Sequence, residues 1–187
     1  MNIEEYKEIL KSKLSEKRYN HCINVSKKAV ELSLKYGVNE QHAMIAGLLH
    51  DITKELSEEE HIKIFKEGNI NLEKIYNTNL KLWHAKSAAV YVNKHLGISD
   101  EDILNAIKYH TTGRKNMSTL EKIIYISDAI SEERTYNDVD KVRKAANENL
   151  DLAMVLLLAL TIKKLINNNM PINEDTFKAY NELINKI

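Results

Sequence analysis

The chain has 187 residues, of which 43% are hydrophobic and 29% charged, the composition of one globular domain with its own core. Basic and acidic residues number 27 each, so the chain lacks the basic field that binds a nucleic-acid polymer or an anionic membrane. The single cysteine, Cys22, excludes an intramolecular disulfide and favours a reducing, cytoplasmic location.

Helix signals follow one another along the whole chain. One proline and five glycines leave few breaks, and no strand or hairpin pattern appears. We predict a single all-α domain over residues 1–187, with a core spanning 16–135 and the helices of 138–187 packed on it. The apolar run 152–162 is too short to cross a bilayer and predicts a core helix. The expected helices are 2–13, 16–36, 39–51, 57–67, 80–96, 99–110, 118–131, 138–148, 150–168 and 174–186.

Polar residues and glycines mark the expected helix ends. A Ser followed three residues later by an acidic residue predicts a capping box, and a glycine after the last turn predicts a C-terminal cap. The predicted boxes are Ser57 with Glu60, Ser99 with Asp102, and Ser118 with Glu121; the capping glycines are Gly37, Gly68 and Gly97. Between two predicted helices, residues 68–79 form the longest stretch expected to be an irregular polar loop.

Ionisable side chains interrupt the apolar stripes of several predicted helices. Residues three, four and seven apart share one helix face, and by this spacing four histidines and one aspartate lie on apolar faces. In chain order these are His21, His50, His84, His110 and Asp128, and Asp51 directly follows His50. A buried carboxylate is costly unless it meets a cation or a metal. A single buried histidine is more often a hydrogen-bonded core residue, but this set from five helices indicates a metal site.

The residue types indicate which kind of metal site this is. Histidines and carboxylates without cysteine suit a catalytic transition metal rather than a structural zinc. In a helical bundle, such a site is built from side chains that face inward from neighbouring helices. The other three histidines, His42, His61 and His95, lie among polar neighbours or at a helix end. We expect His61 to be solvated and His95 to bond the last carbonyls of its own helix.

Five strings of the sequence resemble a known family. They are RYNH at 18–21, AGLLHDITK at 46–54, LWHA at 82–85, YHTTGR at 109–114, and YISDAI at 125–130 followed by Arg134. The chain is similar to the HD-domain phosphohydrolases, which are named for an adjacent His-Asp pair. Within them it resembles the YqeK-type bacterial symmetrical diadenosine tetraphosphate hydrolases. The likeness spans residues 18–134.

The resemblance implies a compact HD-domain bundle with a metal site in its core cleft. It implies that one ion is held by four residues, His21, His50, Asp51 and Asp128. His84 and His110 would line the same cleft, either completing a second metal site bridged by Asp51 or contacting phosphate. Iron is the metal that the resemblance implies, while the ligand types leave manganese, cobalt and zinc open.

The implied reaction is the cleavage of diadenosine tetraphosphate into two ADP by a metal-bound hydroxide. Catalytic roles would fall to His84, His110 and Lys54, and substrate contacts to Arg18, Lys54, Thr111, Thr112, Gly113 and Arg134. The expected partner is a small dinucleoside polyphosphate, and a homodimer is compatible with the sequence. Both assignments have a simpler alternative. Lys54 would then be an ordinary solvated surface lysine, and residues 111–113 would be an ordinary helix end.

Three other functions fit parts of the pattern. The same ligand set would serve an HD-type phosphohydrolase acting on (deoxy)nucleoside mono- or triphosphates. Some proteins of this fold use two irons for oxygen chemistry, but Arg18, Lys54 and Arg134 suit phosphate and argue against an oxygenase. A nucleotide sensor without catalysis is the third, and the complete ligand set argues against it.

Overall fold

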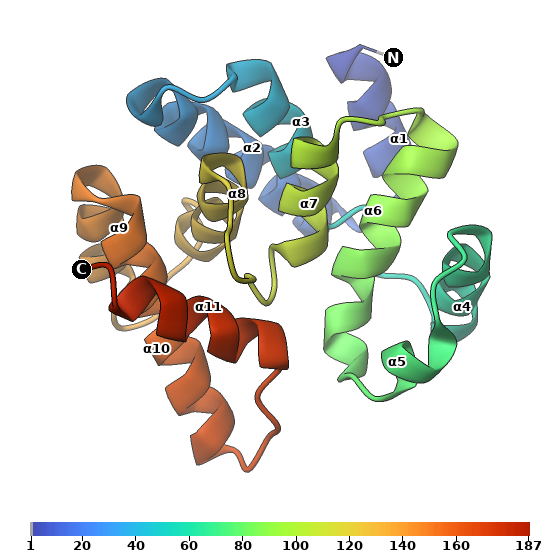
Figure 1. Cartoon of the computed structure of the whole chain (residues 1–187). Helices are drawn as coiled ribbons and strands as arrows, with labels where there is room; N and C mark the ends of the chain where they lie inside the picture. Colours follow the sequence, from blue (N-terminus) through green and yellow to red (C-terminus); the bar gives the residue numbers. More distant parts are fainter. Residues whose placement is uncertain (1) are drawn as a thin grey trace.

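In the computed structural model, which describes residues 2–187 except for the side chain of Tyr76, helices follow one another with short connections and no strand (Figure 1). The prediction of an all-α fold is confirmed. The described elements are α1 (Ile3–Lys13), α2 (Glu16–Tyr36), α3 (Glu40–Leu49), α4 (Glu58–Glu67), α5 (Leu72–Tyr76), the 3-10 turn η1 (Leu80–Leu82), α6 (Trp83–Leu96), α7 (Glu101–Tyr109), α8 (Thr119–Ile130), α9 (Val139–Glu148), α10 (Leu150–Asn167) and α11 (Glu174–Ile184).

Most helix ends lie where polar caps predict them. Ser57 and Ser118 begin α4 and α8 through the expected capping boxes, and Gly37 and Gly97 end α2 and α6 in the left-handed conformation. The predicted cap at Ser99 is wrong. Asp100 begins α7 instead, because its carboxylate accepts hydrogen bonds of 3.0 Å from the amides of both Asp102 and Ile103.

The predicted irregular loop at 68–79 is also wrong in part. It contains the short helix α5, which is capped by Asn71, and it leads into η1, which is capped by Asn79. The side chains of Ile75 and Trp83 account for the order in this segment, since they pack with Phe65 in a small second hydrophobic cluster. Tertiary burial therefore structures a segment whose local composition is polar.

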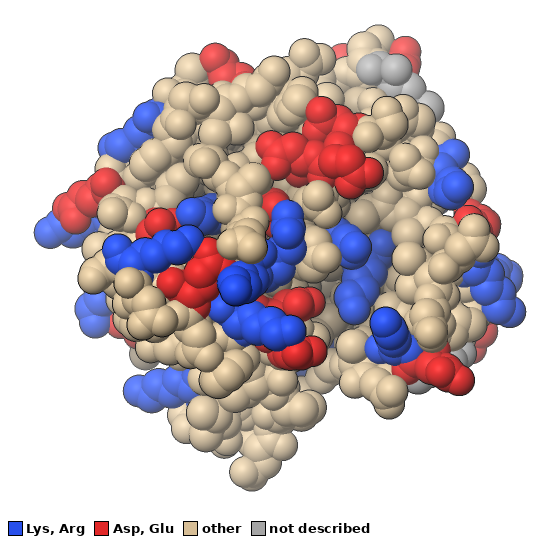
Figure 2. Space-filling model, in the orientation of Figure 1, with Lys and Arg blue, Asp and Glu red and all other residues tan. Residues whose placement is uncertain are grey.

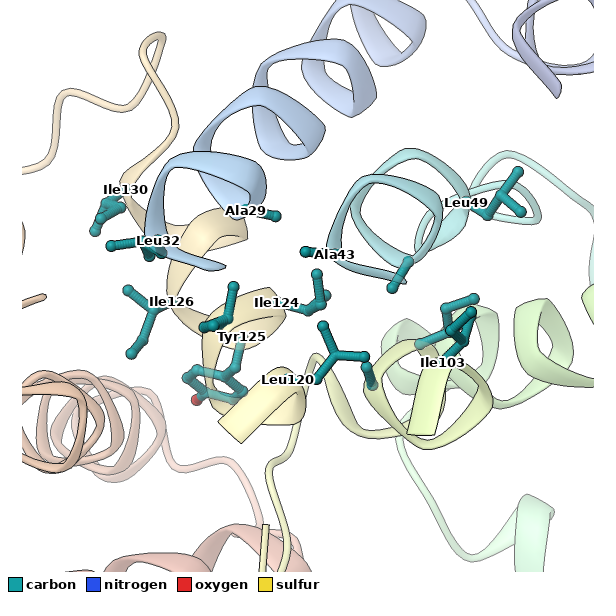
Figure 3. Packing of buried hydrophobic residues seen from close by; sticks show 14 of the residues in the cluster. Ala29, Leu32, Ala43, Leu49, Ile103, Leu120, Ile124, Tyr125, Ile126 and Ile130 are labelled. Carbon is teal, nitrogen blue, oxygen red and sulfur yellow. The ribbon is translucent and has the colours of Figure 1, made fainter. Parts of the chain in front are cut away.

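The main core lies between α2, α3, α7, α8 and α10. Figure 3 shows apolar side chains from four of these helices meeting around α8, among them Leu32, Ala43, Ile103 and Ile124. Helix α8 contacts α2, α3, α7, α9 and α10, and most of its side chains are buried. Each fully buried side chain of this size contributes about 1.5–3 kcal/mol. Helix α8 therefore anchors the bundle.

The C-terminal helices share this core. Val142 of α9, Leu158 of α10 and Ala179 of α11 belong to the same buried cluster as α8. The predicted core helix at 152–162 lies within α10, where Ala153, Met154 and Leu158 are fully buried. No helix among the described residues has both the length and the apolar character that a membrane crossing requires. On the face shown in Figure 2, basic and acidic side chains are interspersed, in keeping with the zero net charge.

Helices α2 and α3 approach each other closely at Gly47. A Cβ atom built on Gly47 would lie 2.9 Å from the Cα of Ser26 and 3.3 Å from the Cβ of Ala29. Real Cβ atoms do not approach backbone this closely, so only glycine allows this spacing. The close approach matters for function because His21 of α2 and His50 at the end of α3 come together beside it.

Replacing Gly47 with alanine is expected to lower the free energy of unfolding by about 1–2 kcal/mol through overpacking against α2. Helix propensity alone would favour alanine by about 1 kcal/mol, so the two effects have opposite signs. Chemical denaturation measures the result. Gln41→Ala, on the exposed face of α3, serves as control and should stay within about 0.5 kcal/mol of the wild type. A stabilised Gly47→Ala protein would contradict the packing described here.

Candidate metal centre

The six predicted ligand residues converge at one point from five helices. His21 lies in α2, His50 and Asp51 follow α3, His84 lies in the first turn of α6, His110 follows α7 and Asp128 lies near the end of α8. The four histidines and Asp51 are buried, while the Asp128 side chain is 24% exposed. The sequence periodicity therefore identified a group of side chains that meet in space.

The Asp51 carboxylate lies at the centre of the group. Its Oδ2 atom lies 3.8 Å from His21 Nε2 and 3.5 Å from His50 Nε2. Its Oδ1 atom lies 3.1 Å from His84 Nε2 and 3.5 Å from His110 Nε2. Each carboxylate oxygen thus faces a different pair of histidines, which is the arrangement that a carboxylate bridging two cations would have.

Asp128 closes the group on the side of His21. Its Oδ1 atom lies 3.0 Å from His21 Nε2 and 4.0 Å from His50 Nε2. Three sets of ligand atoms lie within 4.8 Å of one another and could hold an ion: His21, His50 and Asp51; His50, His110 and Asp128; Asp51, His84 and His110. The cluster can therefore hold a divalent metal.

Three of the histidines have their ring orientation fixed by a bond at Nδ1. His50 Nδ1 donates to the carbonyl of Gly47 at 2.8 Å, and His110 Nδ1 donates to the carbonyl of Ile107 at 2.7 Å. A carbonyl only accepts, so Nδ1 carries a proton and Nε2, which faces Asp51, is the accepting nitrogen of the neutral ring. His21 Nδ1 is bound in the same way to Glu133 Oε1 at 2.5 Å. This is the usual support of metal-binding imidazoles.

The atoms that face the centre fit a metal. Among the described residues, His21 Nε2, His50 Nε2 and Asp51 Oδ1 are buried and form no hydrogen bond of good geometry. Buried polar atoms are nearly always hydrogen-bonded, so three such atoms in one place call for a ligand. Imidazole nitrogen and carboxylate oxygen are donors that first-row transition metals accept.

The charges of the cluster are set by mutual contact. Burial alone would raise the pKa of Asp51, but the surrounding histidines, His50 first, hold it well below its usual range. Burial lowers the pKa of His84 to about 4, only partly opposed by Asp51, so this imidazole is neutral at neutral pH. Burial likewise opposes the ionisation of Asp128, yet the nearby His21 lowers the pKa of that carboxyl. Ionised carboxylates and neutral imidazoles are the forms that bind metals.

Three predicted phosphate-binding cations lie at the edge of the cluster. Arg18 donates to Asp51 Oδ2 at 2.8 Å, and Arg134 donates to Asp128 Oδ1 at 2.6 Å. Lys54 Nζ lies 3.0 Å from His84 Nε2, and burial lowers its pKa. All three side chains are partly exposed. They add positive charge beside the carboxylates, where a polyanionic substrate would need it.

The predicted substrate-binding loop after His110 divides into two parts. Thr111 is partly exposed and lines a cavity, whereas Thr112 and Gly113 are buried. The Thr112 hydroxyl donates to the Gly113 carbonyl at 2.9 Å. A Cβ on Gly113, whose φ is +63°, would lie 3.4 Å from the Cβ of Ala179 in α11. The structure therefore brings only Thr111 to the solvent-facing side of this loop.

Glu133 is a site residue that the sequence reasoning missed. Besides His21, it contacts Ser131 Oγ at 2.8 Å and Asn24 Nδ2 at 2.9 Å, so three partners hold its carboxylate in place. Its pKa is lowered to about 2, since these bonds outweigh the effect of burial. Glu133 follows the end of α8, where helix periodicity no longer applies. An acidic residue five positions after Asp128 was its only signal.

Two predictions about the other histidines are wrong. His61 is buried rather than solvated, because α4 packs on α6 and places its Nδ1 atom 2.8 Å from Ser87 Oγ. His95 bonds Glu67 Oε2 at 2.7 Å and stacks on Tyr91 instead of bonding the carbonyls of its own helix. The residues next to His61 and His95 in the sequence do not reveal these partners. Ser87 and Glu67 lie on a different helix from the histidine that each contacts, and Tyr91 lies one turn before His95.

Comparison with known proteins identifies the family. The sequence profile of the HD domain matches residues 18–133. A Bacillus subtilis (strain 168) protein named bis(5'-nucleosyl)-tetraphosphatase, symmetrical, is 39% identical, and the alignment covers 98% of each chain. A Staphylococcus aureus (strain NCTC 8325 / PS 47) protein of the same name is 33% identical, with 97% of this chain and 94% of that protein covered.

The fold is also close to that of a solved structure. A Clostridium acetobutylicum protein described as a predicted HD superfamily hydrolase involved in NAD metabolism superposes with a TM-score of 0.94. It is 40% identical, and the match covers 100% of this chain and 99% of that one. At this similarity, the arrangement of helices around the cluster is shared.

Replacing Glu133 with glutamine is expected to weaken metal binding by about tenfold or more, because loss of the charged acceptor frees the His21 ring. Competition with a chelator measures the affinity. Glu132→Gln is the matched control, since Glu132 is exposed and neighbours Glu133 in the chain. Equal affinities of the two variants would remove Glu133 from the site.

Proposed function

The chain belongs to the HD domain family, and from this premise we propose that it is a metal-dependent hydrolase that cleaves diadenosine tetraphosphate symmetrically into two ADP. The observation that carries the proposal is the cluster of four histidines and two aspartates with three cations at its edge. The names of the full-length relatives supply the substrate.

The proposed ligands divide into two sets that share Asp51. His21, His50, Asp51 and Asp128 would hold one ion, and Asp51, His84 and His110 would hold a second where two ions are bound. Support comes from the two carboxylate oxygens of Asp51, which face opposite pairs of histidines. Iron is the proposed metal, and the donor set equally accepts manganese, cobalt or zinc.

The reaction breaks the bond between one central phosphorus and the central bridging oxygen of the substrate. Water supplies the new oxygen on that phosphorus, and the departing ADP keeps the bridging oxygen. A divalent metal at this centre polarises phosphoryl oxygens and lowers the pKa of a coordinated water. If His84 and His110 are not ligands, their rings would hydrogen-bond phosphoryl oxygens directly.

Cations of the chain hold the substrate. Arg18 and Arg134 offer planar guanidinium groups that can bond phosphate in a bidentate manner. The Lys54 ammonium, 3.0 Å from His84, neutralises charge on the phosphate that departs. Thr111 would contact phosphate or sugar from the cavity that it lines. The proposed binding partner is therefore a small nucleotide.

The alternative is an HD-type phosphohydrolase acting on (deoxy)nucleoside mono- or triphosphates. The metal centre would be the same, because only the pockets outside it distinguish the substrates. The full-length match to two proteins named as symmetrical tetraphosphatases favours the dinucleotide.

Incubation of the purified protein with a divalent metal and diadenosine tetraphosphate is expected to give ADP as the sole product. Chromatography of the products decides the cleavage position, and AMP plus ATP would contradict symmetrical cleavage. Faster turnover of nucleoside mono- or triphosphates would favour the alternative. Equal rates with and without oxygen exclude an oxygenase.

The same preparation tests the metal ligands. His50→Ala and Asp51→Ala are expected to lose bound metal and at least about a thousandfold in kcat/KM, which equals roughly 4 kcal/mol. Metal content is measured by elemental analysis. Full metal occupancy in both variants would overturn the proposed centre.

Lys54→Met is expected to lower kcat/KM about 10–100-fold while leaving metal content unchanged. A hydrogen bond to a charged group is worth about 1.5–3 kcal/mol, which corresponds to this range. Lys63→Met, on the exposed face of α4, is the control. Loss of metal in Lys54→Met would instead show that Lys54 supports the ligands rather than the substrate.

A further inference from the structure

Two cavities of nearly equal size flank the turn η1 (Leu80–Leu82). One, of about 420 Å³, lies between η1 and α4, where Leu56, His61 and Leu80 line it. The other, of about 410 Å³, lies between η1 and the helices α10 and α11, where Leu82, Leu165 and Met170 line it. Figure 1 shows α4 and α5 on one side of α6 and the pair α10–α11 on the other. Lys81 lines both cavities.

The first cavity reaches the proposed metal centre, and the second reaches the residue that follows a proposed ligand in the chain. Lys54 and His84 line the first one, and Thr111, which directly follows His110, lines the second. The Nε2 atoms of His84 and His110 lie 3.2 Å apart. His84, which lines the first cavity, is therefore in contact with His110, whose neighbour in the chain lines the second.

We propose that the two cavities are the two nucleoside subsites of the enzyme and that Lys81 holds the phosphate chain between them. This inference rests on the proposed function and adds the binding sites for both ends of the substrate. A symmetrical cut divides the substrate at its middle, so equal lengths extend to either side of the reacting phosphorus. Two cavities of similar size, one on each side of η1, match this requirement.

The cavity linings suit a nucleoside. Each volume falls in the range of small-molecule pockets, about 300–1,000 Å³. Apolar side chains offer surface to a base: Leu80, which is 49% exposed, in the first cavity, and Leu165 and Met170 in the second. Asn168 and Thr161 of the second cavity supply polar atoms for base or ribose.

Lysines outnumber carboxylates in the cavity linings, where Lys54, Lys81 and Lys164 stand against Glu58 alone. Within the described part of the chain, neither Lys81 nor Lys164, which lines the second cavity, forms an ion pair with an Asp or Glu. Two unpaired ammonium groups beside the cavities leave positive charge available to the polyphosphate.

The test compares the full substrate with a half substrate. Adenosine 5'-tetraphosphate has the same four phosphates and one nucleoside, and its symmetrical hydrolysis gives ADP and pyrophosphate. It needs only one cavity, whereas diadenosine tetraphosphate needs both. Leu165→Trp fills the second cavity and Lys164→Glu reverses its charge. Ile166→Trp and Lys163→Glu are the matched controls, since both residues are exposed and line neither cavity.

With the wild-type protein, kcat/KM for the dinucleotide should exceed that for the half substrate by at least about tenfold. Leu165→Trp should lower kcat/KM for the dinucleotide about tenfold or more and that for the half substrate less than about threefold. Lys164→Glu should act in the same direction, and both controls should behave like the wild type. Retained turnover of the half substrate shows that each variant is folded.

Equal losses on both substrates, or no loss in either variant, would overturn the second subsite while leaving the proposed function intact. Failure of the proposed function has a different signature. The wild-type protein would then release no ADP from the dinucleotide. In that case, binding of a non-hydrolysed dinucleotide analogue, measured by calorimetry, still decides the subsites: weaker binding to Leu165→Trp than to Ile166→Trp supports them, and equal binding overturns them.

Discussion

The buried carboxylate of Asp51 is the constraint on which the rest of the structure depends. An ionised carboxylate removed from water is costly unless cations or polar groups surround it. Here four imidazole nitrogens and the Arg18 guanidinium lie within 4 Å of its oxygens. These partners come from three other helices, α2, α6 and α7, and from the neighbouring residue His50. The fold must therefore bring these helices to one point, and a divalent metal meets the same electrostatic demand.

Helix ends determine how two of the proposed ligands are oriented. His50 and His110 are the residues at which α3 and α7 end, and each bonds a carbonyl three residues earlier in its own chain. The last carbonyls of a helix have no intrahelical partner, so they are free to hold an imidazole. Gly47 serves both fold and site, because its missing side chain admits α2 and its carbonyl orients His50. Packing and ligand geometry are thus coupled through one residue.

The centre and the surrounding cavities use different parts of the chain. The proposed ligands lie within residues 18–133, which match the HD domain, whereas most of the second cavity is lined by α10, the connection from α10 to α11, and Thr176 of α11. Such a division lets a common metal centre act on different substrates, since the chemistry resides in the centre and the choice of ligand in the surfaces beside it. The turn η1 lines both cavities and so connects the two surfaces beside the metal centre.

The sequence by itself determined the helical class, most helix ends and the set of residues on inward faces. Periodicity identifies His21, His84 and Asp128 because each falls on the apolar stripe of a regular helix. Tertiary structure alone decided the partners. Glu133, which lies beyond the end of α8, contacts His21, and His61 contacts Ser87 on another helix. No local spacing in the sequence predicts either contact. The regular structure within residues 68–79 likewise depends on packing around Phe65 and Trp83. Local sequence fixes which face of a helix is apolar, but which faces meet depends on contacts between segments far apart in the chain.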